Sequence, residues 1–111
     1  MDKSAKDWSE GSIDKFMTAY WNNDSVMYVG GNKIAYGYQH MLAAYKKSFP
    51  DTAAMGKLAF DLLDIRELSA EYYLVTGKFL LTRTIGNASG MFTVLFRKIN
   101  GKWLIVYDHS S

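Results

Sequence analysis

GMFTVLFRKINGKWLIVYDHS, residues 90–110, is the stretch that decides the fold. Residues 90–99 and 103–110 are rich in the β-branched and aromatic side chains that favour strands. Asn100-Gly101 lies between them, and Asn-Gly is the strongest short signal for a β-hairpin. The stretch therefore predicts two long antiparallel strands, Gly90–Ile99 and Trp103–Ser110.

The residues just before this stretch extend the same pattern toward the middle of the chain. Met55–Ile65 and Glu71–Thr84 read as two further strands, with a break between them at Arg66–Ala70. A second break, Gly86–Ser89, separates them from residues 90–110. Strands of this length exceed the usual 5–6 residues, so they must twist and bend. Gly77 in mid-strand marks a bulge or a bend. The second half of the chain is therefore predicted to be an antiparallel meander.

The first half carries helices and one small hairpin. Residues 4–10 predict a short helix, and residues 38–49 predict a longer one that ends at Pro50. Val26–Val29 and Ile34–Tyr36 read as short strands, joined by a turn at Gly30–Lys33 where glycine and asparagine tolerate positive φ.

A second helix is predicted directly after Ser12, whose side-chain oxygen can cap a free backbone N–H. Apolar residues then recur at helical spacing along one face until Asn22: Ile13, Phe16, Met17, Tyr20 and Trp21. Helices followed by a meander predict an α+β fold, in which a strongly curved, cone-shaped antiparallel sheet is closed by helices around a central pocket. A chain of 111 residues fits one such domain, 1–111.

Composition excludes several classes of function. The net charge is only +2 and the basic residues are dispersed, so we expect no nucleic-acid partner. No apolar run approaches the ~18 residues of a membrane span. There is no cysteine, which suits a reducing compartment, and we expect a cytoplasmic protein, with an exported mature form as the alternative.

Motifs along nearly the whole chain resemble the SnoaL-like branch of the nuclear-transport-factor-2-like superfamily, whose members are cone-shaped, cystatin-like α+β domains. These motifs are Phe16-Met17, Tyr20-Trp21, Gly37, Tyr45, Pro50-Asp51, Met55-Gly56, Gly77, Phe79, Leu81, Arg83 and the ending Gly90–Ser110. The ending also resembles the association domain of calcium/calmodulin-dependent kinase II. The resemblance implies a first helix longer than the ten residues before Gly11, so we expect this helix to be short or truncated.

Asp108 and Arg83 are the candidate catalytic residues. Strand alternation puts Asp108 on one face with Leu104 and Val106, and the resemblance to the kinase domain implies that this face looks inward. A carboxylate there is a general base or a ligand anchor, or else a structural partner of a nearby arginine or N–H. Arg83 follows Phe79 and Leu81 at alternate positions. It could hold an anion, reach solvent, or pair with Asp108 or Glu71.

Aromatic side chains with polar tips are the candidate ligand-binding residues, together with Arg83. They are Trp21 and Tyr45 first, then Tyr20 and Tyr36. The default interpretation of each is a core residue. The two histidines, His40 and His109, have no clustered carboxylates, so we expect no metal site. The sequence has no phosphate loop and no dinucleotide-binding fingerprint, and we expect no cofactor.

Two classes of function stay open from these residues. The first is a small-molecule-binding domain without chemistry of its own. The second is a cofactor-free isomerase, dehydratase or polyketide-cyclase-like enzyme that uses the pocket carboxylate. A pure oligomerisation module is a third, weaker interpretation. A closed Asp108–Arg83 pair would argue against an enzyme, whereas an unpaired Asp108 facing a cavity would favour one.

We also expect a homodimer. One face of the sheet carries Phe92, Val94 and Phe96 beside Trp103, Ile105 and Tyr107. Helices can cover only one side of a sheet, so we assign these residues to an uncovered apolar side that a second copy would bury.

Overall fold

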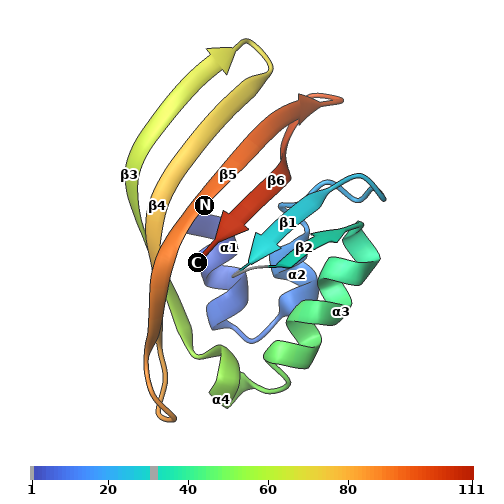
Figure 1. Cartoon of the computed structure of the whole chain (residues 1–111). Coiled ribbons are helices and arrows are strands. Elements are labelled where there is room, and N and C mark those ends of the chain that lie inside the picture. The colour runs from blue at the N-terminus through green and yellow to red at the C-terminus, as the bar shows by residue number, and fades with distance from the viewer. Residues whose placement is uncertain (1, 31–32) are drawn as a thin grey trace.

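The computed structural model describes residues 2–30 and 33–111 (Figure 1). The helices are α1 (Asp2–Ser9), α2 (Ile13–Met17), α3 (Tyr38–Ser48) and α4 (Thr52–Met55), and the strands are β1 (Met27–Gly30), β2 (Lys33–Tyr36), β3 (Lys57–Ser69), β4 (Tyr72–Thr82), β5 (Ala88–Ile99) and β6 (Lys102–Ser110). The predicted turn at Gly31-Asn32 lies outside the described residues.

Six strands in the described part of the chain form one sheet in the order β2-β1-β6-β5-β4-β3. Strands β3 to β6 pair antiparallel with their sequence neighbours, as the meander predicted. Strand β1 pairs parallel with β6 and antiparallel with β2. Figure 1 shows that the sheet curves strongly without closing, and that the helices lie on its concave side. The α+β fold with helices against a curved sheet is confirmed.

Two bulges decide which side chains face the helices. In β3, the register shifts between Leu62 and Asp64, opposite Gly77. In β6, Ile105 pairs with Phe96 and Tyr107 pairs with Leu95, so Val106 is an extra residue without a partner in β5. A bulge moves every following side chain by one position relative to strict alternation.

The bulge at Val106 corrects the predicted faces of the sheet. Phe92, Val94 and Ile105 are 2–4% exposed and lie in the core, whereas they were assigned to the uncovered side. Ile105 and Asp108 share the concave face because the bulge lies between them. The predicted grouping of Asp108 with Leu104 and Val106 is therefore wrong.

Helix α2 is shorter than the apolar spacing predicted. Ser12 caps it as expected, since its side chain accepts a hydrogen bond from the Lys15 N–H, but the helix ends at Met17. The backbone of Ala19 to Trp21 pairs instead with β6: Trp21 N donates to Ile105 O at 2.9 Å, and Ile105 N donates to Ala19 O at 2.9 Å. Tyr20 and Trp21 consequently leave the helix in extended backbone and point in different directions.

The other element bounds differ from the predictions by a few residues. Strand β3 starts at Lys57 and runs to Ser69, later at both ends than predicted, because Thr52–Met55 forms a helical turn capped by Asp51. The Asp51 carboxylate accepts from Ala54 N at 2.8 Å. Gly56 then takes a φ of 63°, which glycine adopts without strain and which turns the chain into the sheet.

Candidate functional site

A cavity of about 140 Å³ lies between the concave face of the sheet and the helices. Most of its wall is apolar and comes from the sheet and from helices α1, α2 and α3. The lining consists of Trp8, Phe16, Phe49, Leu58, Phe60, Phe79, Leu81, Phe92, Val94 and Ile105, with polar atoms from Ser4, Tyr20, Tyr28, Tyr45, Asp108 and Ser110.

Trp8 of α1 forms one wall of the cavity. The side chain is 3% exposed, and its ring meets those of Phe16 and Phe49 edge-on with centroids 4.9 Å apart. Its indole N–H donates to the Met55 carbonyl at 2.8 Å. The one polar atom of the side chain is therefore satisfied by the protein, and Trp8 offers a ligand only its apolar surface.

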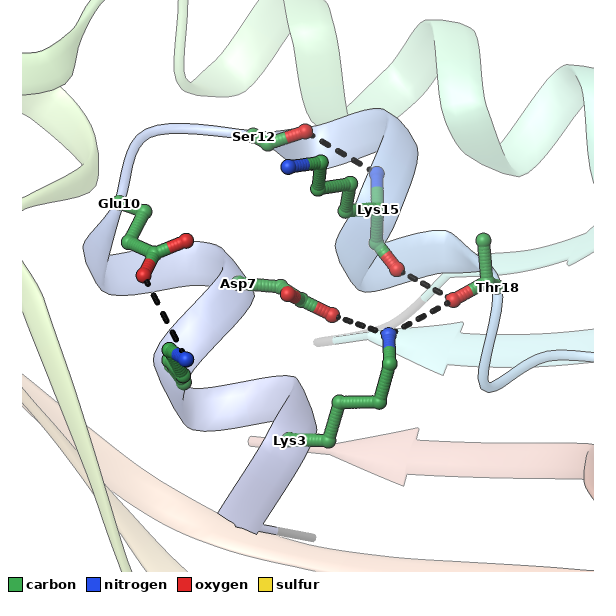
Figure 2. A network of polar contacts seen from close by, with 7 residues as sticks. Lys3, Asp7, Glu10, Ser12, Lys15 and Thr18 are labelled. Atoms are coloured by element: carbon green, nitrogen blue, oxygen red, sulfur yellow. Dashed lines mark hydrogen bonds and ion pairs between the residues drawn. The ribbon is translucent and has the colours of Figure 1, made fainter.

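Helix α1 is held in place at both ends, although it is only eight residues long. Figure 2 shows Lys3 reaching between Asp7 and Thr18, with Nζ 2.6 Å from the Asp7 carboxylate and 3.5 Å from the Thr18 hydroxyl. At the other end, Leu58 N of β3 donates to the Ser9 hydroxyl at 2.9 Å. These contacts fix α1 against both α2 and the sheet, and they keep Trp8 over the cavity.

Asp108 forms the polar end of the cavity. The residue is 3% exposed, and both carboxylate oxygens accept hydrogen bonds. The Tyr20 hydroxyl donates to Oδ2, and the Ser110 hydroxyl donates to Oδ1 at 2.8 Å. Tyr28 and Tyr45 also line this cavity, and their rings are 5.7 Å apart. Three tyrosines from three different segments thus surround one buried carboxyl.

The ionisation of these groups is shifted by burial. Burial raises the pKa of Asp108, while the hydrogen bonds from Tyr20 and Ser110 oppose that rise. Burial raises the pKa of Tyr20 and Tyr45 well above 10.0, and the nearby charge of Asp108 raises both further. Tyr28 is shifted in the same direction by burial and then by Asp108. The tyrosines stay neutral hydrogen-bond donors at physiological pH, and burial makes Asp108 hold its proton more tightly than an exposed aspartate does.

This shift predicts an unusual pH dependence of stability. Because the folded pKa of Asp108 lies above its ordinary value of 3.8, the folded state holds this proton more tightly than the unfolded chain does. The contribution of Asp108 to the free energy of unfolding should therefore fall as the pH rises from about 3.8 through the folded pKa. Urea unfolding of the wild type and of Asp108→Asn across this range measures it. The free energy of unfolding of the wild type minus that of Asp108→Asn should fall as the pH rises. A value that stays constant or increases with pH would contradict the assignment.

The structure brings only part of the predicted site together. Asp108, Tyr20 and Tyr45 line the cavity. Trp21 is half-buried against the core but is not part of the lining, because its backbone pairing with Ile105 turns it away from Tyr20. Tyr36 is 59% exposed on β2. The prediction that these two side chains form pocket walls is wrong.

Arg83 does not meet Asp108. Strand β4 ends at Thr82, and Arg83 donates from Nε to Gly86 O at 2.7 Å and from Nη1 to Ala54 O at 3.0 Å. Asp108 lies opposite Val94, which lies opposite Val75, eight residues before Arg83 along the chain. Arg83 therefore ties the β4–β5 turn to α4, and the predicted Arg83–Asp108 pair is corrected.

Several lining residues were not singled out by sequence reasoning. Phe92, Val94 and Ile105 were assigned to the wrong face, because the bulge at Val106 leaves no signal in the alternation. Trp8 was not among the candidates, although a lone tryptophan on an otherwise polar helix is itself a sign of a buried contact. Ser110 follows Asp108 at spacing two, and that spacing could have indicated their hydrogen bond.

The described residues were also compared with the requirements of a metal site and of a membrane-spanning helix. The residues that the structure describes contain no group of three or more His, Cys, Asp or Glu side chains that could hold a metal ion. His40 and His109 are both exposed. Within the same described ranges, no helix is long and apolar enough to span a bilayer.

Comparison with known proteins places this geometry in a family. The sequence profile of the SnoaL-like domain matches residues 1–111. An NTF-2 like protein of unknown function from Shewanella oneidensis is 36% identical, with a TM-score of 0.95 over 99% of this chain and 91% of that one. No protein of curated function matches.

More distant solved structures share the fold alone. A candidate calcium/calmodulin-dependent protein kinase type II association domain from Thiobacillus denitrificans is 18% identical, with a TM-score of 0.83 over 99% of this chain and 89% of that one. A ketosteroid isomerase-like protein from Erwinia carotovora is 17% identical, with a TM-score of 0.75 over 99% and 88%. With the full-length profile match and the close Shewanella relative, the chain belongs to the SnoaL-like domain family and has an NTF2-like fold.

Proposed function

We propose that the chain acts as one small-molecule-binding domain whose ligand occupies the cavity between the sheet and the helices. The observation that carries this proposal is the combination of an aromatic cavity of about 140 Å³ with one buried carboxyl at its end. A cavity of roughly 150 Å³ lined by apolar side chains binds benzene. Ligand pockets in general combine apolar walls with a few placed polar groups.

Binding of single-ring probes tests this proposal. Benzene and toluene should shift the NMR resonances of cavity residues and raise the melting temperature, because a ligand that binds only the folded state stabilises it. At a free concentration of ten times Kd, the expected stabilisation is about 1.4 kcal/mol. Neither shift would be seen if the cavity were closed to ligands, and that result would overturn the proposal.

A matched pair of variants localises the binding. Val94 is 2% exposed and lines the cavity, so Val94→Phe should fill the space and abolish the benzene-dependent shift. Thr93→Phe adds the same ring one position earlier on β5, where the side chain faces the opposite side of the sheet, next to Thr76. Benzene binding should persist in Thr93→Phe. Binding that survives in Val94→Phe would assign the probe to another site.

A cofactor-free enzyme is the second candidate, and one observation favours it. Asp108 faces a cavity and has a raised pKa, and none of the described arginine side chains bonds to it, which suits a general base. Hydrogen–deuterium exchange of the acidic C–H bonds of a small ketone such as cyclopentanone, followed by NMR, tests for proton abstraction. Exchange faster than buffer that is lost in Asp108→Asn supports an enzyme; exchange equal to buffer argues for a binding domain.

We also propose that the protein is a homodimer through the uncovered end of the sheet. The ends of β3, β4 and β5 that lie nearest the β3–β4 turn extend beyond the helices (Figure 1). Large apolar side chains are exposed on and beside this end: Leu62, Leu63, Ile65, Leu68 and Trp103. Four of these five side chains lie within seven consecutive residues of β3, and a two-fold contact would remove them from water. Light scattering should give about twice the monomer mass of 12.6 kDa.

A charge placed on this end should separate the copies. Ile65→Lys is expected to shift the mass to that of the monomer, because an unpaired charge in a buried interface is costly. Ile85→Lys is the control, since Ile85 is equally exposed but lies in the β4–β5 turn at the other end of the sheet. A monomeric wild type at micromolar concentration would remove the dimer proposal.

A further inference from the structure

The buried carboxyl of Asp108 has no cationic side chain beside it among the described residues that line the cavity. The Tyr20 hydroxyl, after α2, donates to this carboxyl. Tyr28 of β1 and Tyr45 of α3 line the same cavity, and the charge of Asp108 raises the pKa of both. The strand of Asp108 itself adds His109, which is exposed. Among the described residues, none with a cationic side chain lines the cavity. A buried carboxylate normally has a cationic partner, because an isolated buried charge is costly.

Hydrogen bonds from the protein nevertheless stabilise the ionised form of Asp108. Hydrogen bonds to a carboxylate favour its charged form, and each oxygen here accepts one, from Tyr20 and from Ser110. Both donors come from hydroxyl groups fixed by the fold, since Tyr20 is 5% exposed and Ser110 belongs to the same strand as Asp108. The site therefore carries oriented donors for an anion and lacks the cation that would complete it.

The rest of the wall suits an organic cation. The cavity surface is formed largely by aromatic rings, among them Phe16, Tyr45 and Phe92. The faces of such rings attract ammonium groups, and carbon substituents on the nitrogen gain from burial against them. A cavity of about 140 Å³ has room for a ligand with one small ring and is too small for a polycyclic ligand.

We propose that the cavity binds a small organic ammonium ion, a protonated amine on a body of about one ring, with its nitrogen against the Asp108 carboxylate. The inference rests on the proposed function, because it names the class of ligand for the same cavity. The amine supplies the missing positive charge, Asp108 accepts its N–H, and the aromatic rings enclose its apolar part.

A charge series of equal size tests the inference. Benzylamine is a cation at neutral pH, benzyl alcohol is neutral and benzoate is an anion, and all three carry the same ring. Calorimetry or NMR titration of the wild type should give Kd values that rise in that order, with benzylamine at least about tenfold tighter than benzyl alcohol, a difference of about 1.4 kcal/mol. Benzyl alcohol binding as tightly as benzylamine would overturn the inference and leave the proposed function standing. If none of the three binds, both fail.

Two variants assign the preference to Asp108. In Asp108→Asn the affinity for benzylamine should fall to that for benzyl alcohol, while the affinity for benzyl alcohol changes less than about threefold. Arg83→Met changes a charge outside the cavity and should retain the preference. If Asp108→Asn does not fold, the wild type still decides the matter: benzylamine stays protonated on acidification, so its affinity, and not that of benzyl alcohol, should fall as Asp108 gains a proton. A cation preference that survives in Asp108→Asn or at acid pH would refute the assignment.

Discussion

Replacing Trp8 with alanine is expected to cost about 3–5 kcal/mol in the free energy of unfolding, the range for large buried aromatic side chains. The ring is 3% exposed and contacts three other aromatic rings, those of Phe16, Tyr45 and Phe49. The substitution also removes the donor to the Met55 carbonyl. Urea unfolding followed by circular dichroism measures the loss.

Tyr36→Ala is the control for this prediction. Tyr36 is 59% exposed on β2, at the opposite edge of the sheet from β3. Its replacement should cost about 1 kcal/mol or less, because it removes an aromatic ring that is not buried. A Trp8→Ala loss no larger than that of Tyr36→Ala would mean that α1 does not pack over the cavity in solution.

Loss of Trp8 should also change ligand selection. Removing the ring opens the wall that α1 contributes, so the cavity of a folded Trp8→Ala variant should accept bodies larger than one ring. Naphthalene, which the wild type is expected to reject, is a direct probe. Rejection of naphthalene by the folded variant would indicate that the helices collapse into the vacated space.

Replacing Gly77 with valine is expected to cost about 3 kcal/mol, at the upper end of the usual range for overpacking. A Cβ atom at Gly77 would stand 2.6 Å from the Asp61 carbonyl oxygen and 2.9 Å from the Phe92 ring. The carbonyl belongs to the paired strand β3 and cannot move without breaking the register beside the bulge at Leu63. Equilibrium unfolding gives the loss.

The Phe92 ring is the more movable neighbour, and its displacement links Gly77 to the site. The ring packs against Phe60 with centroids 5.3 Å apart, and both rings line the cavity. Pushing Phe92 inward should weaken benzene binding in Gly77→Val. Ala59→Val serves as the control, because Ala59 is exposed on β3 and the same residue there should change stability by no more than about 0.5 kcal/mol. Equal losses for the two variants would be inconsistent with a close approach at Gly77.

Local sequence determined most of the elements, their order along the chain and the kind of fold. Alternating β-branched and aromatic residues with Asn100-Gly101 between them specify the β5–β6 hairpin, because turn chemistry and strand preference act over a few residues. Ser12 and Asp51 each cap a helix, since a cap needs only a backbone N–H three residues away. The resemblance to the kinase association domain implied that Asp108 faces inward. The residue lines the cavity, although Leu104 and Val106 do not share its face.

The tertiary structure alone decided which side chains meet in the cavity. The bulge at Val106 arises from pairing with β5, and it moves Ile105 to the face of Asp108 although strict alternation separates them. Helix α2 stops at Met17 because the backbone of Trp21 bonds to Ile105, a residue far away in the chain, and so Tyr20 reaches Asp108 while Trp21 does not. Arg83 lies just past the last residue of β4, where spacing along a strand no longer fixes direction, and it bonds to backbone carbonyls instead. Each of these outcomes depends on hydrogen bonds between residues that are distant in sequence, and local periodicity carries no record of such bonds.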